Sequence, residues 1–400
     1  MTLGTIRKCV SLFKSCNSTN LVSLHTLSES ATLRNLKRGL IMDSSRPVST
    51  FPEEKPKKLN LVSKKEIEEF EDLFPGLVND LVTNEHFGNL TEVTSRFAKS
   101  LNYNVPHGKK NRGLAVVASY KILEKPENLT PENIKLANIL GWLIEMLQAF
   151  LLVMDDVTDG SETRRGQPCW YKLENIGISA INDGIILENS VYLLLKKYFR
   201  QHPSYVYLME SFLDVTRKTI IGQILDCNIV DLDTLSMERF ELIAYNKTAH
   251  YSFFLPVSLA LYLANYTEPE VHQQVKGVLL EIGKYFQVQD DYLDCYGDPE
   301  ITGKIGTDIE TGKCTWLAAK ALQIASADQK KIMEENYGKQ DPENVRKIKD
   351  LYNELGIAEL YAQYEEQSYS EIQSSILDLP KEAPQELLQK IVAVFYKRNA

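Results

Sequence analysis

The spacing of apolar residues constrains the fold of this chain more than any other sequence feature. After residue 62, apolar residues recur three and four positions apart, which places them on one face of an α-helix. This spacing predicts helices at residues 65–82, 134–158, 181–200, 205–225, 236–264, 270–293, 313–325 and 344–375. Sustained alternation with a period of two does not occur. The sequence therefore predicts an all-α fold, a large single-domain bundle of roughly ten helices.

The first 42 residues differ from the rest of the chain in charge. They contain six basic residues and one acid, a net charge of +5, so the remaining residues contribute −14 to the total of −9. This basic segment is rich in Ser and Thr, which is typical of a mitochondrial transit peptide. The alternative is a disordered tail. A chain that starts at Met42 would lack this segment and would be cytoplasmic.

A proline-containing segment at residues 43–61 has no apolar periodicity and is predicted to be a linker. The helical domain would then cover residues 62–400. An acidic chain in which 44% of residues are hydrophobic is neither disordered nor a general nucleic-acid binder. The six cysteines include no CxxC pair, so neither a zinc site nor a disulfide framework is indicated.

The longest apolar run, residues 136–154, approaches the length of a membrane span. It contains Asn138, Glu145 and Gln148 and leads directly into two aspartates. We therefore expect a buried helix of the bundle and no membrane span.

Two aspartate-rich segments each follow an apolar helical stretch. Residues 155–159 read DDVTD and residues 290–294 read DDYLD, so each segment places carboxylates at positions i and i+4, on one helix face. Like charges at this spacing repel each other, unless a divalent cation such as Mg²⁺ binds between them. One such segment could be a solvated acidic helix end, but two copies favour a pair of metal sites.

Basic residues follow both aspartate segments, as expected if the metal ions hold a phosphorylated substrate. Arg164 and Arg165 come shortly after the first segment, and Lys304 and Lys313 come after the second. Upstream, residues 107–113 read HGKKNRG, where glycines could let backbone N–H groups approach an anion. Together these residues indicate Mg²⁺–diphosphate chemistry.

With these motifs, the chain resembles the farnesyl diphosphate synthases, which are short-chain trans-prenyltransferases of isoprenoid biosynthesis. The resemblance runs from about residue 62 to the C-terminus and includes TRRGQPCWY, YNKTAHYSFFLP, FQVQDDYLD and TGKIGTDI. It implies the isoprenoid synthase fold, an all-α bundle around a central cavity, and a homodimer. It also implies that isopentenyl diphosphate condenses with dimethylallyl and then geranyl diphosphate, giving geranyl and farnesyl diphosphate.

The resemblance also assigns roles to individual residues. Asp155, Asp159 and Asp290 would bind about three Mg²⁺ ions, for which Mn²⁺ or Co²⁺ could substitute, and Asp156, Asp291 and Asp294 would support them. The predicted contacts of the allylic diphosphate and its cation are Arg164, Lys247, Thr248, Gln287, Lys304 and Lys313, of which Lys247, Thr248 and Gln287 would be catalytic. The predicted contacts of isopentenyl diphosphate are Lys109, Arg112, Gln148, Arg165 and Arg398.

Three positions depart from the family pattern. His107 replaces the first glycine of a Gly-Gly-Lys sequence, and the basic C-terminus is reduced to Arg398-Asn399-Ala400. Phe150 and Leu151 stand where a pair of phenylalanines is common. These last two lie about one turn before Asp155, so they should form the floor that limits the length of the product.

Two other functions remain open. A terpene synthase built on the same scaffold would ionise a prenyl diphosphate without using isopentenyl diphosphate, and a synthase could also stop mainly at geranyl diphosphate. A non-catalytic subunit or acidic metal-binding scaffold would have no reason to keep both halves of the site. Lys109, Arg112 and Arg165 are all present, which favours prenyl transfer.

Overall fold

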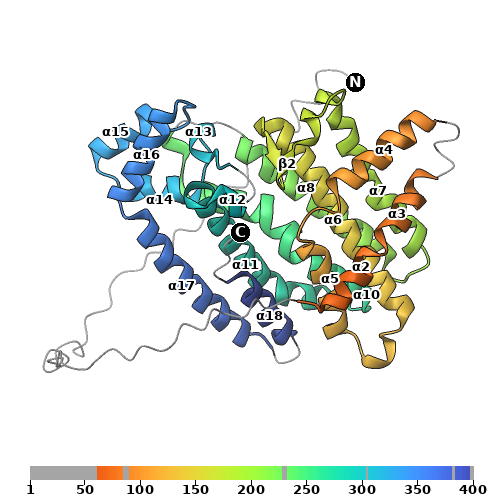
Figure 1. The fold of residues 1–400 in the computed structure, drawn as a ribbon. Coiled ribbons are helices and arrows are strands. Elements are labelled where there is room, and N and C mark those ends of the chain that lie inside the picture. Colours follow the sequence, from red (N-terminus) through yellow and green to blue (C-terminus); the bar gives the residue numbers. More distant parts are fainter. Residues whose placement is uncertain (1–60, 84–89, 228–231, 303–304, 381–382, 397–400) are drawn as a thin grey trace, which may run out of the picture. The chain divides into compact units, whose positions relative to one another are not determined.

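Two long helices, α6 (Pro131–Asp159) and α11 (Pro269–Tyr296), end in the two aspartate motifs. In the computed structural model they run through the middle of the helical body (Figure 1). The structure describes residues 61–83, 90–227, 232–302, 305–380 and 383–396. The predicted leader, almost all of the linker, Lys304 and Arg398 lie outside the described residues.

The sequence accounts for the position of α6. Its N-cap residue Thr130 accepts a hydrogen bond from the backbone N–H of Asn133, and Pro131 occupies the first helical position. At the other end, Gly160 adopts a left-handed conformation that ends the helix directly after Asp159. Most side chains between these ends are buried, as expected for a helix at the centre of a bundle.

Among the helices on either side of α6 in the chain, α5 (Asn111–Leu123) and α7 (Ala180–Phe199) make the most extensive contact with it, and α4 (Thr91–Asn104) and α8 (Tyr205–Cys227) also pack against it. The other helices of this part are α2 (Lys64–Glu71), α3 (Phe74–Val82) and α9 (Met237–Ile243). Two-residue strands β1 (Thr163–Arg164) and β2 (Gln167–Pro168) form an antiparallel hairpin after α6. Short 3-10 turns cover Pro126–Asn128, Trp170–Lys172, Gly177–Ser179 and Leu232–Thr234.

A π-helix, Ala244–Phe254, follows α9 and leads into α10 (Leu255–Leu263). After α11 come α12 (Pro299–Thr302), α13 (Asp308–Thr311), α14 (Trp316–Ile324), α15 (Ala327–Asn336), α16 (Pro342–Glu354), α17 (Ile357–Leu377) and α18 (Gln385–Phe395). The prediction of an all-α fold is confirmed, because the hairpin is the only sheet in the described part of the chain.

The predicted helix boundaries need correction at three places. The stretch 65–82 divides into α2 and α3, because Pro75 starts a new helix. The stretch 236–264 is an α-helix, a π-helix and a second α-helix. The stretch 344–375 breaks before α17, where Gly356 has a φ of 66° that is unfavourable for other residues. Apolar spacing also missed α4, α5, α15 and α18, so the described helices exceed the expected ten.

Candidate active site

The first aspartate motif lies where α6, α8 and the π-helix meet. Asp155 accepts a hydrogen bond from the side-chain amide of Gln223 on α8 at 2.6 Å. The ammonium group of Lys247 lies 3.4 Å from the same carboxylate, and the guanidinium of Arg164 lies 3.5 Å from its other oxygen. The structure therefore brings three residues with predicted roles together, Asp155, Arg164 and Lys247.

A further carboxylate, Asp226 on α8, holds the two predicted lysines side by side. Its Oδ2 atom lies 2.6 Å from Lys247 Nζ and 2.8 Å from Lys313 Nζ. Lys313 also contacts Asp159 at 3.0 Å, so the cluster continues to the last carboxylate of the first motif. The phenol of Tyr337 donates to the backbone carbonyl of Lys313 at 2.6 Å and fixes that segment.

The charged groups in this cluster shift one another's pKa values. Burial opposes the ionisation of Asp226, but the neighbouring Lys247 and Lys313 lower its pKa overall. Burial likewise opposes the charge on Lys247, yet Asp155 and Asp226 hold its pKa well above the usual value. For Asp159, burial and the charge of Asp155 raise the pKa in spite of Lys313. The two lysines are therefore kept as cations next to the carboxylates of the first aspartate motif.

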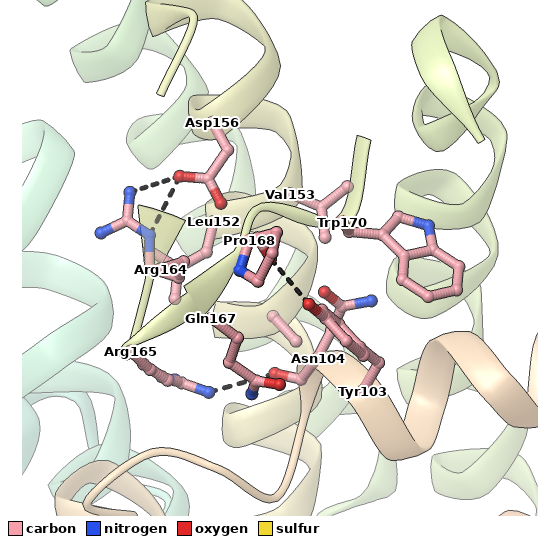
Figure 2. Close-up of a pocket in the computed structure, with 11 residues that line it drawn as sticks. Tyr103, Asn104, Leu152, Val153, Asp156, Arg164, Arg165, Gln167, Pro168 and Trp170 are labelled. Atoms are coloured by element: carbon pink, nitrogen blue, oxygen red, sulfur yellow. Dashed lines mark hydrogen bonds and ion pairs between the residues drawn. The ribbon is translucent and has the colours of Figure 1, made fainter. Parts of the chain in front are cut away.

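Asp156 points away from this cluster and binds Arg164. The guanidinium contacts Asp156 Oδ1 through Nε at 2.9 Å and Nη2 at 2.5 Å (Figure 2). A small pocket lies beside this pair, between α4, the last turns of α6 and the hairpin, and Arg165 reaches across it to donate to the Asn104 carbonyl at 3.1 Å. Asp156 therefore orients an arginine of the site, and its predicted role in supporting metal ions stays a prediction.

The second motif has neutral hydrogen-bond donors. Asp291 accepts from the backbone N–H of Trp316 and from the side-chain amide of Gln287, both at 2.8 Å. Gln287 in turn accepts a short hydrogen bond from the Thr248 hydroxyl. Burial raises the pKa of Asp291 to about 8. This chain of contacts joins the second motif to the π-helix and gives Thr248 and Gln287 their positions.

The other two aspartates of the second motif lie nearer the surface. Asp290 and Asp294 are both partly buried, and Asp294 accepts from the backbone N–H of Asp308 at 3.1 Å. This contact ties the end of α11 to the segment that precedes Lys313.

Arg112, one of the predicted isopentenyl diphosphate residues, lies at the start of α5, and the guanidinium of Arg165 lies against Gly108, just before this helix. Arg112 donates to the hydroxyls of Ser252 at 2.9 Å and Tyr251 at 3.0 Å, and its guanidinium lies 4.6 Å from the centre of the Tyr251 ring. Gln148 on α6 is partly buried, whereas Lys109 is exposed, as is His107.

Glu145, which the sequence analysis did not assign to the site, is buried beneath these arginines. It accepts from the backbone N–H of Gly113 at 2.8 Å. Burial raises its pKa, although the charges of Arg112 and Arg165 act in the opposite direction. The Glu145 side chain thus holds the start of α5 against α6.

Both glycines of the HGKKNRG segment have a packing function. A Cβ atom at Gly108 would lie 2.7 Å from an Arg165 nitrogen, and one at Gly113 would lie 2.9 Å from the Gly141 carbonyl oxygen. Gly113 lies within helix α5, and its backbone N–H donates to Glu145. These glycines allow close packing of Arg165 and of α5 on α6, respectively.

The residues predicted to form the floor lie on α6 below the first motif. Phe150 is buried and faces α7, where a Cβ atom at Gly184 would lie 3.6 Å from its ring. Leu151 is partly buried against the same apolar core. The structure thus places Phe150 within the packed interior, one turn from Asp155.

Sequence reasoning missed Gln223, Asp226 and Glu145. Gln223 and Asp226 end the apolar helix α8 as a polar pair three residues apart, a signal similar to that of the aspartate motifs. Glu145 is a lone charged residue in an apolar run and was read only as an argument against a membrane span.

The donor atoms of the site decide which metal ions could bind there. Within the described ranges, no group of three or more His, Cys, Asp and Glu side chains could hold a metal ion. The donor chemistry nevertheless fits a hard cation, because Asp155 and Asp159 offer carboxylate oxygens one helical turn apart.

Two segments have the length and apolar composition of membrane spans, Pro131–Asp159 and Gly177–Phe199. The first is largely buried in the bundle, as expected for a core helix, and the second packs against it. That neither crosses a membrane stays a prediction.

Comparisons with known proteins identify the family of this chain. A family model of polyprenyl synthetases matches residues 94–355. The farnesyl pyrophosphate synthase of Gallus gallus is 46% identical, over 85% of this chain and 94% of its own length. The farnesyl pyrophosphate synthase of Candida albicans is 45% identical, over 83% and 97% of the two lengths.

Among solved structures, the T. brucei farnesyl diphosphate synthase complexed with a bisphosphonate superimposes with a TM-score of 0.78 at 28% identity, over 84% of this chain and 100% of that one. The predicted isoprenoid synthase fold and the predicted class of enzyme, a transferase of isoprenoid biosynthesis, are thereby confirmed. The chain belongs to the polyprenyl synthetase family of prenyltransferases.

Proposed function

We propose that this protein is a farnesyl diphosphate synthase, which joins isopentenyl diphosphate to dimethylallyl and then to geranyl diphosphate. The observation that supports this most directly is the cluster of Lys247, Lys313 and Arg164 around the first aspartate motif. These cations lie where a metal-bound diphosphate would need positive charge. The names of the relatives from chicken and Candida support the same product.

The reaction begins with departure of the allylic diphosphate. When bound to the aspartates, Mg²⁺ supplies positive charge that stabilises the departing diphosphate. Lys247, Lys313 and Arg164 contribute to the same stabilisation as fixed cations. Thr248 and Gln287, held to each other by a hydrogen bond, line the path of the allylic cation.

The second substrate is held at the start of α5. Lys109, Arg112 and Arg165 would bind the diphosphate of isopentenyl diphosphate, so that its double bond lies at bonding distance from the allylic cation. One new carbon–carbon bond forms, and one proton then leaves the product. The released diphosphate is the base that accepts this proton.

The alternative function is a terpene synthase on the same scaffold. The residues at the start of α5 distinguish the two functions. Such an enzyme would not need cations for a second diphosphate, yet Arg112 and Arg165 are held beside a buried carboxylate, Glu145. The decisive experiment is product analysis with radiolabelled isopentenyl diphosphate and each allylic partner. Label in farnesyl diphosphate supports our proposal, whereas label only in geranyl diphosphate indicates a shorter product. Terpene hydrocarbons without incorporated label would identify a terpene synthase.

The length of the product depends on Phe150 in this proposal. Its ring packs against α7 about one turn before the first motif, so we expect a growing chain to meet it after leaving the aspartates. Phe150→Ala should open the floor and shift the products toward twenty carbons or longer. An unchanged product distribution would place the floor elsewhere.

Magnesium dependence is the second part of the proposal. The carboxylates of Asp155 and Asp159 would repel a diphosphate in the absence of a divalent ion. We expect chelation with EDTA to abolish turnover and Mg²⁺, Mn²⁺ or Co²⁺ to restore it. Turnover in excess chelator would contradict this mechanism.

A homodimer is the third part, supported by one exposed face of α8. Val206, Leu213, Ile220 and Ile224 are exposed apolar residues at spacings of seven and four, so they share one side of the helix. A second copy of the chain would cover them. Light scattering should show a dimer in the parent protein and a monomer after Leu213→Lys with Ile220→Lys.

The location of the enzyme is the fourth part. Residues 1–42 fused to a reporter should direct it to mitochondria, and a chain that starts at Met42 should remain in the cytoplasm and keep full activity. A cytosolic reporter would favour the disordered-tail alternative.

A further inference from the structure

The catalytic lysine and threonine lie in an unusual helix. Lys247 and Thr248 belong to the π-helix Ala244–Phe254, whose backbone turns are wider than those of an α-helix. Such helices are rare and usually short, so neighbouring elements must stabilise this one. Two straight helices, α8 and α11, make extensive contact with it.

A glycine on α8 lies directly against the backbone of Lys247. A Cβ atom at Gly222 would lie 2.1 Å from the Lys247 nitrogen and 2.6 Å from its Cα atom. No side chain fits there unless the two helices separate. Gly222 therefore sets how closely α8 and the π-helix approach each other.

A glycine on α11 has the same relation to a different side of the π-helix. A Cβ atom at Gly283 would lie 2.3 Å from Ala249 Cβ and 2.5 Å from Ala249 Cα. Lys247 and Ala249 are two residues apart, and positions two apart lie on nearly opposite sides of a helix whose turn spans more than four residues. The π-helix is thus held between two glycines.

Each glycine lies one turn before the residue that binds the catalytic side chain. On α8, Asp226 follows Gly222 by four residues and contacts the Lys247 ammonium at 2.6 Å. On α11, Gln287 follows Gly283 by four residues and accepts from the Thr248 hydroxyl. Residues four apart share a helix face. On each helix, the glycine therefore sets how closely the π-helix approaches, and the polar residue sets where the Lys247 or Thr248 side chain points.

We propose that Gly222 and Gly283 are positioning residues that clamp the π-helix and thereby place Lys247 and Thr248 for the allylic step. The proposal rests on the proposed prenyl transfer. A methyl group at either position would push the π-helix away from its partner helix. Lys247 would then move away from Asp155 and Asp226, and Thr248 from Gln287.

The test compares Gly222→Ala and Gly283→Ala with Gly277→Ala. Gly277 also lies on α11, but a Cβ atom there would meet nothing within 4 Å, so this control should leave turnover and folding unchanged. A displacement of about 1 Å at a reacting centre lowers turnover roughly 100-fold, which is the loss we expect for each clamp variant. Circular dichroism would establish that each variant is folded.

Double variants distinguish positioning from general damage. If Gly222 acts through Lys247, Gly222→Ala should lower kcat far less in a Lys247→Met background than in the parent. Gly283→Ala should behave likewise in a Thr248→Val background. Equal fold-losses in both backgrounds, turnover like that of Gly277→Ala, or failure of both clamp variants to fold would each overturn the proposal.

The parent enzyme is assayed first. If the parent is active and the glycine substitutions leave its turnover unchanged, the clamp is refuted but the proposed function is not. A parent that forms no product from isopentenyl and allylic diphosphates refutes the proposed function. Binding of inorganic diphosphate to the same variants then tests the clamp, which predicts weaker binding for Gly222→Ala than for Gly277→Ala.

Discussion

The two aspartate motifs share a sequence pattern but have different partners. Their second aspartates, Asp156 and Asp291, are both almost completely buried, with 4% and 5% of their surface exposed. Asp156 is bound by the guanidinium of Arg164, whereas Asp291 accepts from a backbone N–H and an amide. Of the third aspartates, Asp159 contacts the ammonium of Lys313, and Asp294 accepts from the backbone N–H of Asp308.

This difference indicates a division of labour between the two helix ends. At the end of α6, the protein itself supplies cations that balance the carboxylates and that could also bind a diphosphate. At the end of α11, a backbone N–H and an amide orient the carboxylate of Asp291, and burial raises the pKa of this group to about 8. In the proposed reaction, Asp156 would thus be held by a cation and Asp291 by neutral donors.

The largest effect should come from removing one carboxylate with a predicted metal-binding role from either motif. Asp155→Asn and Asp290→Asn should each lower turnover by about 100-fold or more, because each removes charge from the proposed magnesium site. Steady-state assays at saturating Mg²⁺ would measure the loss, with Asp214→Asn on the surface of α8 as the control. Turnover within tenfold of the parent for one variant would show that only the other motif is required.

Removing the cation that balances Asp156 should mainly affect stability. Arg164→Met leaves a buried carboxylate without its ion pair, and breaking such a pair costs about 3–5 kcal/mol of unfolding free energy. Urea unfolding at neutral pH would measure it. Arg217→Met, at an exposed pair with Asp214, should change stability by less than about 0.5 kcal/mol. Equal effects would mean that burial does not distinguish the two pairs.

Acid should weaken the cluster around Asp226. The pKa of this group is lowered on folding by Lys247 and Lys313, so the unfolded chain takes up its proton at a higher pH than the folded protein does. The stabilisation is therefore complete above the usual value near 3.8 and is lost as the pH falls through the lower folded pKa. The stability difference between the parent and Asp226→Asn should shrink below that value. A difference that is the same at pH 7 and pH 3 would contradict this assignment.

The sequence predicted those parts of the fold and site that depend on neighbouring residues. The helices α6 and α11, their ends and the two aspartate motifs follow from apolar spacing and from residues such as Pro131 and Gly160. The π-helix was not predicted, because its form depends on the close approach of α8 and α11 rather than on its own apolar pattern. Asp226 was missed for a similar reason, since its partner lysines are distant in sequence and meet it only in the folded protein.

The smallest effect is expected at Thr248, whose uncharged contacts lead to Asp291 of the second motif. Its hydroxyl donates to Gln287, which donates to Asp291, so the contact is one step from the second motif. Thr248→Val keeps the shape but leaves the Gln287 oxygen without its donor, which should cost about 1 kcal/mol in stability and lower turnover several-fold. Thr248→Ser keeps the hydroxyl and should retain most of both. Because no charge is removed, these losses should be well below those of Arg164→Met. A Val variant as damaging as Arg164→Met would show that the second motif depends as much on its neutral contacts as the first does on its cations.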